Sequence, residues 1–477
     1  MGKMCYTHSV RVRAHTRENE ELTMEQNRKA EHFGSRIGFI LAAAGSAVGL
    51  GNIWRFPYLA AKYGGGIFIF CYILLALTFG FTLMLTEIAI GRKTQKSAIG
   101  AYRAVDRRFS FLGILAALVP VIITPYYCVI GGWVLKYFAS FAVGGGAALA
   151  DDGSAFSSFI SDPGMSAVFF AVYVLLNALV VLLGVQKGIE KISKLLMPLL
   201  VVLTVGIAVY TMTLPGAFEG VKYYLLPDFK GMTLGKFMKV LVAAMGQLFY
   251  SLSIAMGIMI TYGSYVRRRE SLEKSVRQIS LFDTAIALLS GLIIVPSVFI
   301  FSAGDPAALN AGPSLMFITL PNVFAGMRGG QIIGAVFFLL VTLAAMTSSI
   351  SLMETVADIV SELLRIKRRL STLITLAAVL VLGMFSILGC SVWSGFTILG
   401  MQLLDFFDYI SNNVMMPVVA LLTCILVGYV VKTKYVEDEV LSSQPKFSAL
   451  WLYRIMTWVF CPLCMIVILV TNFFITL

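Results

Sequence analysis

The sequence contains little charge and almost no histidine. Of its 477 residues, 13% are Asp, Glu, Lys or Arg and 58% are hydrophobic, and the mean hydropathy is +0.87. Soluble globular domains carry about twice this share of charged residues, so the composition excludes a water-soluble protein. The three histidines all precede the first long apolar segment: His8, His15 and His32. A histidine metal site or a histidine-based catalytic triad within a membrane is therefore excluded.

Cysteine is also sparse, with seven residues scattered mostly through apolar segments. The pair in Cys461-Pro-Leu-Cys464 has the spacing of a redox motif, but no β-α-β pattern surrounds it. We interpret these thiols as small apolar side chains. The ATP-binding pattern G-x-x-x-x-G-K-S/T is missing, which argues against an ATP-driven pump. The intramembrane carboxylates lack a nucleophile–base arrangement, so we expect no enzyme activity.

Apolar windows of about 20 residues recur along the chain, and each is long enough to cross a hydrocarbon core of ~30 Å. They predict an all-α integral membrane protein with about eleven transmembrane helices. The predicted spans cover residues 36–59, 66–91, 111–139, 166–185, 192–214, 238–266, 277–303, 331–363, 370–389, 395–430 and 449–476.

The net charge of +12 is concentrated in alternate loops. Residues 140–165 hold three aspartates and no Lys or Arg, whereas the loops that follow even-numbered spans are basic. By the positive-inside rule, residues 1–33 form a cytoplasmic tail without a signal peptide, and the C-terminus lies outside the cell (inner) membrane. We assign the basic runs to cytoplasmic loops and expect no nucleic-acid binding. They contain Arg92, Lys93, Lys96, Arg103, Arg107, Arg108, Lys187, Lys191, Lys194, Arg267, Arg268, Arg269, Arg365, Lys367, Arg368, Arg369, Lys432 and Lys434.

Two of the predicted spans are interrupted by glycine and small polar residues. Residues 45–56 read G-S-A-V-G-L-G-N-I-W-R-F in span one, and residues 247–263 read Q-L-F-Y-S-L-S-I-A-M-G-I-M-I-T-Y-G in span six. Irregular backbone survives at membrane depth only where it lines a cavity or a ligand. Interruptions five spans apart indicate two structural repeats with a substrate site between them. Close packing of small residues between helices is the alternative explanation.

The half-helix ends that such breaks create have opposite polarity. Exposed N–H groups at one end carry partial positive charge, and exposed carbonyl groups at the other carry partial negative charge. The first suit a carboxylate, and the second suit Na⁺ or an ammonium group. The pattern therefore predicts a transporter whose site holds a zwitterion together with a coupling cation.

Ionisable residues within spans are costly, and we treat them as functional candidates. They are Arg55, Glu87, Asp283, Asp405 and Asp408. The last two share one face of a helix and could pair with Arg55 across an opening.

A hydroxyl cluster, Thr347-Ser348-Ser349, lies in span eight. Hydroxyl oxygens are ligands that hard cations accept, so the cluster is a candidate Na⁺ site. Hydroxyl groups that bond back to their own helix are common in membrane helices and remain an alternative.

Several motifs together resemble the neurotransmitter:sodium symporter family, whose bacterial members carry amino acids. The most specific is A-A-A-G-S-A-V-G-L-G-N-I-W-R-F-P-Y at residues 42–58. Supporting motifs are Y-G-G-G at 63–66, P-Y-Y at 125–127, G-Q-L-F-Y-S-L-S at 246–253, I-T-L-P at 318–321 and T-S-S at 347–349. The resemblance is to a leucine/tryptophan-type, chloride-independent member. It implies a 5+5 inverted repeat over residues 34–214 and 238–430, with helices 1 and 6 unwound at mid-membrane and an extra span at 447–477.

The resemblance also implies site residues, carried over position by position. The substrate carboxylate would meet backbone N–H groups at the first break, and the ammonium would meet nearby carbonyl groups. The implied substrate set is Ala47, Leu50, Gly51, Ile123, Tyr127, Tyr250, Ser251, Ser253, Met256, Ser348 and Leu352. Two Na⁺ sites are expected, the first with Ala47, Asn52, Ser251 and Asp283, and the second with Gly45, Val48, Ala344, Thr347 and Ser348.

The same resemblance implies an outer gate and an inner gate. Arg55 and Asp408 resemble the outer gate. At the inner gate, Glu362 stands for the usual aspartate, and Ala30 occupies the position of the expected arginine. We expect a basic residue at 28–29, Arg28 or Lys29, to reach Glu362.

Departures from the family pattern carry further predictions. Asp283 stands where many members have asparagine, and Ala287 stands where chloride-dependent members have a serine, so we expect transport without chloride. Tyr250 replaces a phenylalanine that closes over the substrate. Met256 stands where an aromatic residue is more common, and its flexible side chain favours a pocket roomy enough for large apolar or aromatic side chains.

The sequence thus supports one functional hypothesis and two alternatives. The hypothesis is sodium-coupled import of a neutral, hydrophobic or aromatic amino acid by alternating access. The expected partners are that amino acid and the lipid bilayer, with no obligate protein partner. A substrate-binding paralogue that does not transport would lose gate or sodium ligands, whereas Asp408, Thr347 and Ser348 are present. An ion channel would show repeated pore-lining segments and fluxes independent of substrate.

Overall fold

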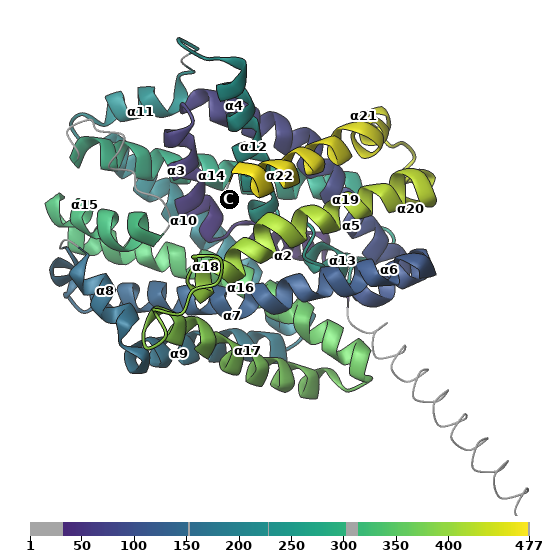
Figure 1. The fold of residues 1–477 in the computed structure, drawn as a ribbon, viewed down its shortest axis with the longest axis horizontal. Helices are drawn as coiled ribbons and strands as arrows, with labels where there is room; N and C mark the ends of the chain where they lie inside the picture. Colours follow the sequence, from purple (N-terminus) through teal and green to yellow (C-terminus); the bar gives the residue numbers. More distant parts are fainter. Residues whose placement is uncertain (1–31, 151–152, 228, 302–312, 476–477) are drawn as a thin grey trace, which may run out of the picture.

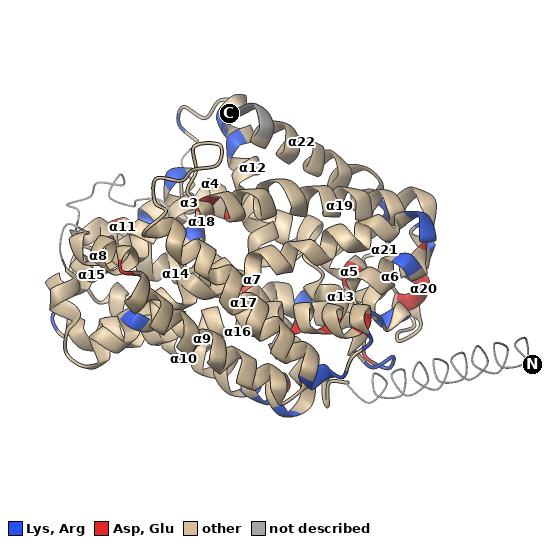
Figure 2. Ribbon diagram, turned by 60° about the horizontal axis from the view of Figure 1, so that its bottom comes forward, with Lys and Arg blue, Asp and Glu red and all other residues tan. Residues whose placement is uncertain are grey.

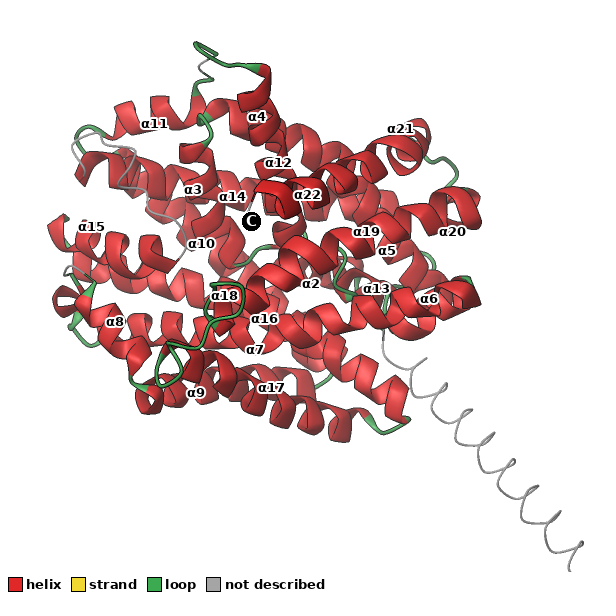
Figure 3. Ribbon diagram, viewed as in Figure 1, coloured by secondary structure: helices red, strands yellow, loops and turns green. Residues whose placement is uncertain are grey.

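The structure, a computed structural model, describes residues 32–150, 153–227, 229–301 and 313–475. Within these ranges the chain folds into helices joined by turns, and no β-strand is present (Figure 3). The prediction of an all-α membrane protein is confirmed. Of the about eleven predicted spans, nine helices of the described residues are long and apolar enough to cross a membrane, or ten if the bent first pair counts as one span; the broken sixth span is not among them. Most of the predicted tail lies outside the described residues, and with it Arg28, Lys29 and Ala30.

The first five predicted spans are present as helices, and the first of them is bent by 56° at its break. Span one consists of α2 (Arg36–Ala47), η1 (Gly51–Arg55) and α3 (Phe56–Lys62), and span two of α4 (Gly66–Leu75), η2 (Ala76–Gly80) and α5 (Phe81–Thr94). Span three is α7 (Ser110–Ala142), span four is α9 (Pro163–Leu182), and span five is η5 (Val185–Glu190) with α10 (Lys191–Met212).

The remaining spans follow in the predicted order, and the sixth is again broken. It consists of α12 (Leu234–Ser251) and α13 (Ile258–Ser264), and it is followed by α14 (Leu272–Phe301), α16 (Gly330–Leu364) and α17 (Arg368–Cys390). Span ten comprises α18 (Leu403–Asp408), η8 (Tyr409–Met415), α19 (Met416–Ile425) and η9 (Leu426–Val430), and span eleven comprises α21 (Leu450–Ile455), η10 (Met456–Phe460) and α22 (Cys461–Ile475).

Short helices connect the spans, and one predicted boundary is wrong. The span predicted at 395–430 begins only at Leu403, because residues 391–402 form turns. Within these turns Leu399 and Gly400 have φ values of 52° and 75°, which a helix does not accommodate. The connecting helices are α6 (Ala98–Val105), η3 (Arg107–Phe109), η4 (Gly146–Leu149), α8 (Ser154–Ser161), α11 (Ala217–Leu225), η7 (Leu315–Thr319), α15 (Leu320–Gly326) and α20 (Lys434–Leu441).

The two broken spans lie beside the long helices at the centre of the molecule. Helices α7 and α16 pack along each other (Figure 1), and α2 packs against α10, α14 and α16. Helix α13, the second half of span six, packs against α5. The core is therefore built around the breaks, which places irregular backbone where protein and not lipid surrounds it.

The start of α2 is fixed by a side-chain cap and a buried carboxylate. Ser35 Oγ accepts a hydrogen bond from Gly38 N at 3.0 Å, as an N-cap residue does. The Glu190 carboxylate accepts from Gly34 N at 2.6 Å and from Ser35 Oγ at 2.8 Å. The Glu190 carboxylate of span five thereby accepts hydrogen bonds from a backbone N–H and a hydroxyl group at the N-terminus of span one.

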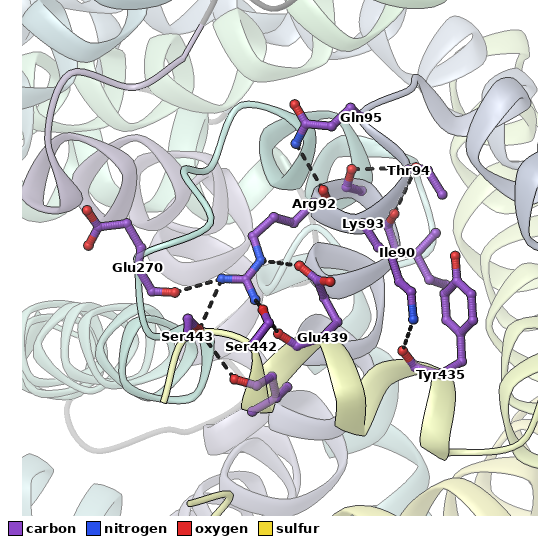
Figure 4. A network of polar contacts seen from close by, with 12 residues as sticks. Ile90, Arg92, Lys93, Thr94, Gln95, Glu270, Tyr435, Glu439, Ser442 and Ser443 are labelled. Carbon is purple, nitrogen blue, oxygen red and sulfur yellow. Dashed lines mark hydrogen bonds and ion pairs between the residues drawn. The ribbon is translucent and has the colours of Figure 1, made fainter. Parts of the chain in front are cut away.

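The last turn of α5 is tied to distant parts of the chain by a buried arginine. The Arg92 side chain is fully buried, pairs with Glu439 of α20 at 2.6 Å and donates to the Glu270 carbonyl oxygen at 2.7 Å (Figure 4). Lys93 lies beside it, 3.8 Å from the centroid of the Tyr435 ring. These partners replace the water that a buried guanidinium loses. Charged residues gather at this end of the molecule, around α6, α13 and α20 (Figure 2).

Helix α20 is held from its other side as well. Arg454 donates two hydrogen bonds to the Glu437 carboxylate, at 2.8 and 2.7 Å, and these lower the pKa of that carboxyl. The segment after α20 is tied to the start of α14, because Gln444 Nε2 donates to Glu273 Oε2 at 2.9 Å. The connection between spans ten and eleven is thus anchored on spans two, seven and eleven.

The contact between α5 and α13 generates a stability prediction. A Cβ atom at Gly91 would lie 1.9 Å from the Ile260 carbonyl oxygen, so Gly91→Ala must push the two helices apart. We expect the free energy of unfolding to fall by about 1–3 kcal/mol, the usual cost of overpacking. Thermal unfolding of the purified protein, followed by size-exclusion chromatography, measures this.

The matched control for Gly91→Ala is Gly206→Ala in α10, where an added Cβ meets nothing within 4 Å. This variant should unfold at the wild-type temperature or slightly above it, because alanine favours a helix by up to about 1 kcal/mol over glycine. Equal unfolding temperatures for the two variants would contradict the tight α5–α13 contact.

Candidate functional site

The break in span one leaves helix-end carbonyl groups beside α16. Helix α2 ends at Ala47, Val48 is extended with φ −74° and ψ 104°, and helical structure resumes at Gly51. Ser348 Oγ lies 3.4, 3.0 and 3.3 Å from the carbonyl oxygens of Gly45, Ser46 and Val48. The negative end of the α2 dipole therefore faces the hydroxyl cluster of span eight.

The break in span six contains residues in the left-handed region. Ser253 and Ala255 have φ values of 53° and 64°, which are costly for residues other than glycine. Two contacts hold this conformation: Ala255 N donates to Glu87 Oε1 at 2.7 Å, and Ser253 Oγ donates to the Ser46 carbonyl oxygen at 2.9 Å. Glu87, a candidate because of its place in an apolar span, thus fixes the backbone of the second break.

A buried cluster joins the two breaks to α14. Asn52 Nδ2 donates to Ser251 Oγ at 2.9 Å and to Asp283 Oδ1 at 2.7 Å, and Ser251 Oγ donates to the same carboxylate oxygen at 2.8 Å. The other oxygen, Asp283 Oδ2, accepts from the Tyr72 hydroxyl at 3.1 Å. These four side chains are almost completely buried. Three members of the predicted first Na⁺ set meet here, and the fourth, Ala47, lines the neighbouring cavity.

The predicted second Na⁺ set also converges. Ser348 Oγ reaches the carbonyl oxygens of the first break. Thr347 Oγ1 instead donates to carbonyl oxygens of its own helix, Ala344 at 3.0 Å and Leu343 at 3.2 Å, which is the alternative that the sequence left open for this hydroxyl. A Cβ at Gly45 would lie 3.1 Å from Thr347 Cβ, so glycine is what allows α2 and α16 to approach so closely here. Hydroxyl and carbonyl oxygens from two helices are thereby gathered in one place.

A narrow central cavity, with a volume of about 30 Å³, lies between the breaks, α7 and α16. Every predicted substrate residue except Ser251 lines it, and Ser251 belongs to the Asp283 cluster instead. The lining residues that were predicted are Ala47, Leu50, Gly51, Ile123, Tyr127, Tyr250, Ser253, Met256, Ser348 and Leu352. Those not predicted are Ser46, Gly49, Ile258 and Asn412.

The cavity is polar near the breaks and apolar away from them. The Tyr127 hydroxyl lies 3.3 Å from Leu50 N, which donates to it. A Cβ at Gly51 would lie 2.2 Å from the Tyr250 ring, so only glycine lets this ring cover the break. Ile123, Met256 and Leu352 supply the apolar wall.

The two predicted outer-gate residues lie near each other but do not form an ion pair. The Arg55 guanidinium lies 5.3 Å from the centroid of the Tyr250 ring. Asp408 Oδ1 accepts from the Tyr126 hydroxyl at 3.1 Å and from Asn412 Nδ2 at 2.7 Å. Each charge therefore has its own partners, and among the ion pairs of the described residues none joins Arg55 to Asp408. Asn412 could have been suspected from its position four residues after Asp408 in an apolar span.

The predicted inner-gate residue Glu362 lies near the C-terminal end of α16, where its Oε2 accepts a hydrogen bond from Ser97 N at 2.8 Å. Its predicted partners, Arg28 and Lys29, lie outside the described residues. Another carboxylate on this helix, Glu354, was not predicted. It is fully buried, and it accepts from Arg368 at 2.8 Å and from the Tyr265 hydroxyl at 2.7 Å. Its position in the apolar run S-L-M-E-T-V-A was the available sequence signal.

Comparison with known proteins places this arrangement in a family. The model of the Sodium:neurotransmitter symporter family matches residues 30–144 and 152–476. An uncharacterized sodium-dependent transporter of Haemophilus influenzae is 33% identical over 463 residues, covering 94% of this chain and 99% of its own. The uncharacterized sodium-dependent transporter YhdH of Bacillus subtilis is 34% identical over 403 residues, covering 84% and 88%.

A solved structure shares the fold. The crystal structure of MhsT in complex with L-phenylalanine matches with a TM-score of 0.82 and 32% sequence identity, covering 93% of this chain and 99% of that one. The family match and the shared fold confirm the resemblance that the motifs predicted. This multi-pass membrane protein belongs to the Sodium:neurotransmitter symporter family and is a sodium-dependent transporter.

Proposed function

We propose that the protein is a sodium-coupled symporter that imports a neutral, hydrophobic or aromatic amino acid by alternating access. One observation carries the proposal: the ends of two broken spans meet at a cavity that is flanked by two separate oxygen clusters. Such an arrangement can hold a zwitterion and coupling cations together, because each helix end offers charge of one sign.

The two oxygen clusters are the proposed Na⁺ sites. The first comprises the Ala47 carbonyl, Asn52, Ser251 and Asp283, and the second comprises the residues around Ser348: Gly45, Val48, Ala344 and Thr347. Their carbonyl, hydroxyl and carboxylate oxygens are ligands that hard cations prefer. In the first site the Asn52 nitrogen faces the carboxylate, so coordination by its oxygen requires the amide to turn.

The amino acid would lie between these sites once the lining side chains move apart, because the cavity has a volume of about 30 Å³ in this structure. Its carboxylate would face the N–H groups of Leu50 and Gly51 and the Tyr127 hydroxyl, and its ammonium would face the carbonyl groups of Ala47, Tyr250 and Ser251. The apolar wall supports a hydrophobic or aromatic side chain, as does the L-phenylalanine bound to MhsT.

Chloride is not expected to be needed. The Asp283 carboxylate supplies a fixed negative charge beside the first cation site, and the Tyr72 hydroxyl already donates to its second oxygen. Ala287, which is fully buried, offers no hydroxyl to an anion. We therefore expect the Asp283 carboxylate to balance the charge of the bound cation, as chloride does in chloride-dependent members of the family.

For the orientation, we propose that the N-terminus is cytoplasmic and the C-terminus external. The gathering of charged residues around α6, α13 and α20 supports this, since basic residues favour the cytoplasmic side (Figure 2). Arg55 and Asp408 would then lie at the outer opening, and Glu362 with Glu354 at the inner one. Residues 34–214 and 238–430 would be the two repeats that move relative to each other.

The membrane potential is sufficient to drive accumulation. Two Na⁺ ions crossing ~100 mV release about 4.6 kcal/mol. Because ~1.4 kcal/mol corresponds to a tenfold ratio, voltage alone would support roughly thousandfold accumulation.

The experiment that tests this function is uptake of radiolabelled L-phenylalanine by proteoliposomes with an inward Na⁺ gradient. We expect concentrative uptake that needs Na⁺ and is competed by aromatic and branched apolar amino acids. Binding without uptake would identify a non-transporting paralogue. Na⁺ current without any amino acid would identify a channel.

Replacement of Asp283 should weaken the coupling to Na⁺. We expect Asp283→Asn to raise the Na⁺ concentration for half-maximal uptake at least about tenfold, because contacts with a charged group contribute ~1.5–3 kcal/mol. Asp405→Asn removes a carboxylate outside the cluster and should leave the Na⁺ dependence unchanged. An unaltered Na⁺ dependence in Asp283→Asn would refute its role as a cation ligand.

The anion requirement provides an independent prediction. Wild-type uptake should have the same rate when gluconate replaces chloride. In the double variant Asp283→Asn, Ala287→Ser, the fixed charge is lost and a hydroxyl is gained, so chloride should stimulate uptake. Strict chloride dependence of the wild type would show that Asp283 does not supply the compensating charge.

The apolar wall predicts selectivity by size. Met256→Phe replaces a flexible side chain with a rigid ring, so inhibition of uptake by tryptophan should weaken about tenfold relative to inhibition by leucine. Met238→Phe, at an exposed position on α12 outside the cavity, is the control and should not change the ratio. An unchanged ratio in Met256→Phe would remove Met256 from the substrate pocket.

A further inference from the structure

One side chain of the central cavity has an unused hydrogen-bond acceptor. Asn412, from η8 of span ten, lines this cavity and is only 8% exposed. Its Oδ1 atom is buried and accepts no hydrogen bond from the described residues. A buried polar atom without a partner costs free energy, and natural proteins retain few of them. The Asn412 oxygen is therefore available to a ligand.

The orientation of the Asn412 carboxamide is fixed by its nitrogen. Nδ2 donates to Asp408 Oδ1 at 2.7 Å and to the Tyr126 hydroxyl at 3.1 Å. An ionised carboxylate can only accept, so the amide must present its nitrogen to Asp408 and turn its oxygen away. Span ten and α7 thus hold the free acceptor in place before any ligand binds.

The Asn412 oxygen faces the central cavity. Asn412 and Tyr250 lie between this cavity and a larger one of about 570 Å³, which Arg55 also lines. An atom that faced the larger cavity would be accessible to water, because a cavity of this size has room for many water molecules. The Asn412 oxygen is not accessible, so it is turned toward the narrow central cavity.

The serine hydroxyls around the central cavity already have acceptors. Ser253 Oγ donates to the Ser46 carbonyl oxygen at 2.9 Å, and Ser348 Oγ donates to the same oxygen at 3.0 Å. The groups proposed for the carboxylate and the ammonium of the amino acid belong to the two breaks and α7. Asn412 lies outside that set, so its acceptor is left for the side chain of the substrate.

The partner that the Asn412 oxygen lacks is a neutral donor on an apolar body. None of the described residues that line the central cavity is charged, so a charged side chain would be costly to bury there. Ile123, Met256 and Leu352 form an apolar wall that suits an aromatic ring. Indole combines such a ring with one N–H group that donates and never accepts. A phenyl ring or an aliphatic side chain would leave the oxygen unpaired.

We propose that Asn412 is a specificity-determining residue whose Oδ1 accepts a hydrogen bond from the indole N–H of bound tryptophan. This preference rests on the proposed function, since it names the side chain that the central site favours. The contact favours tryptophan over analogues that match its shape but lack the donor. Apolar contact with Met256 alone would not make this distinction.

The test compares L-tryptophan with L-3-(benzothiophen-3-yl)alanine, in which sulfur replaces the indole N–H. Isothermal titration calorimetry of the purified full-length protein in Na⁺ buffer measures the dissociation constants of both. We expect the wild type to bind tryptophan about threefold to tenfold more tightly, the effect of one neutral hydrogen bond. Asn412→Leu keeps a similar shape and removes the acceptor, so this ratio should fall to about one.

Asn413→Leu is the matched control, because Asn413 lines the larger cavity and not the central one. It should keep the wild-type ratio. Asn412→Leu also removes the contacts of Nδ2 with Asp408 and Tyr126, but that loss affects both ligands alike, and the ratio reports on the oxygen. Size-exclusion profiles matching the wild type establish that the variants are folded.

Two results would overturn this preference and leave the proposed function standing. They are equal affinity of the wild type for the two ligands, and a wild-type ratio that persists in Asn412→Leu. A persisting ratio with weaker binding of every amino acid would assign the Asn412 oxygen to the ammonium group or to the gate. The wild-type comparison needs no variant, so it holds even where Asn412→Leu does not fold.

Calorimetry also separates this preference from the transport proposal. A protein that binds tryptophan more tightly than the analogue but does not accumulate L-phenylalanine refutes import alone. A protein that binds none of these amino acids refutes both.

Discussion

The structure depends on hydrogen bonds made directly between its two interrupted spans. Ser253 in the second break donates to the Ser46 carbonyl in the first, and Asn52 and Ser251, one from each span, meet at the Asp283 carboxylate. Unpaired backbone groups at membrane depth cost several kcal/mol each. The breaks are stable together because each supplies partners that the other lacks. Neither can become a regular helix without leaving polar groups of the other unpaired.

Much of this arrangement could be predicted because it is encoded locally. Apolar length defines the spans, and the glycines around Gly49 and Gly51 mark the first break within a few residues. The residues of the cation sites and of the cavity lie in or opposite those short motifs. Once the two breaks face each other, residues such as Asn52 and Ser251 are brought together by the fold, with little dependence on how any single helix is rotated.

The contacts that could not be predicted depend on the rotation and depth of neighbouring helices. The pairing of Glu87 with Ala255 N, the ion pair between Glu354 and Arg368, and the exposure of Asn412 to two cavities each need the relative position of two helices. For the same reason the sequence could not show that Arg55 and Asp408 each have other partners in this structure, and their role as the outer gate stays a prediction. Complementary charge shows that two residues can meet, whereas helix placement decides whether other partners intervene.

The buried arginine at the end of α5 has a consequence for how the chain is made. Arg92 and its partner Glu439 are 347 positions apart, so ten spans are synthesised before the pair can form. Until then the guanidinium must remain hydrated, because an unpaired charge in apolar surroundings costs several kcal/mol. We therefore expect the end of α5 to stay at the water interface until α20 has been synthesised. A chain cut short before α20 is left with an exposed cation where the finished protein has a closed end.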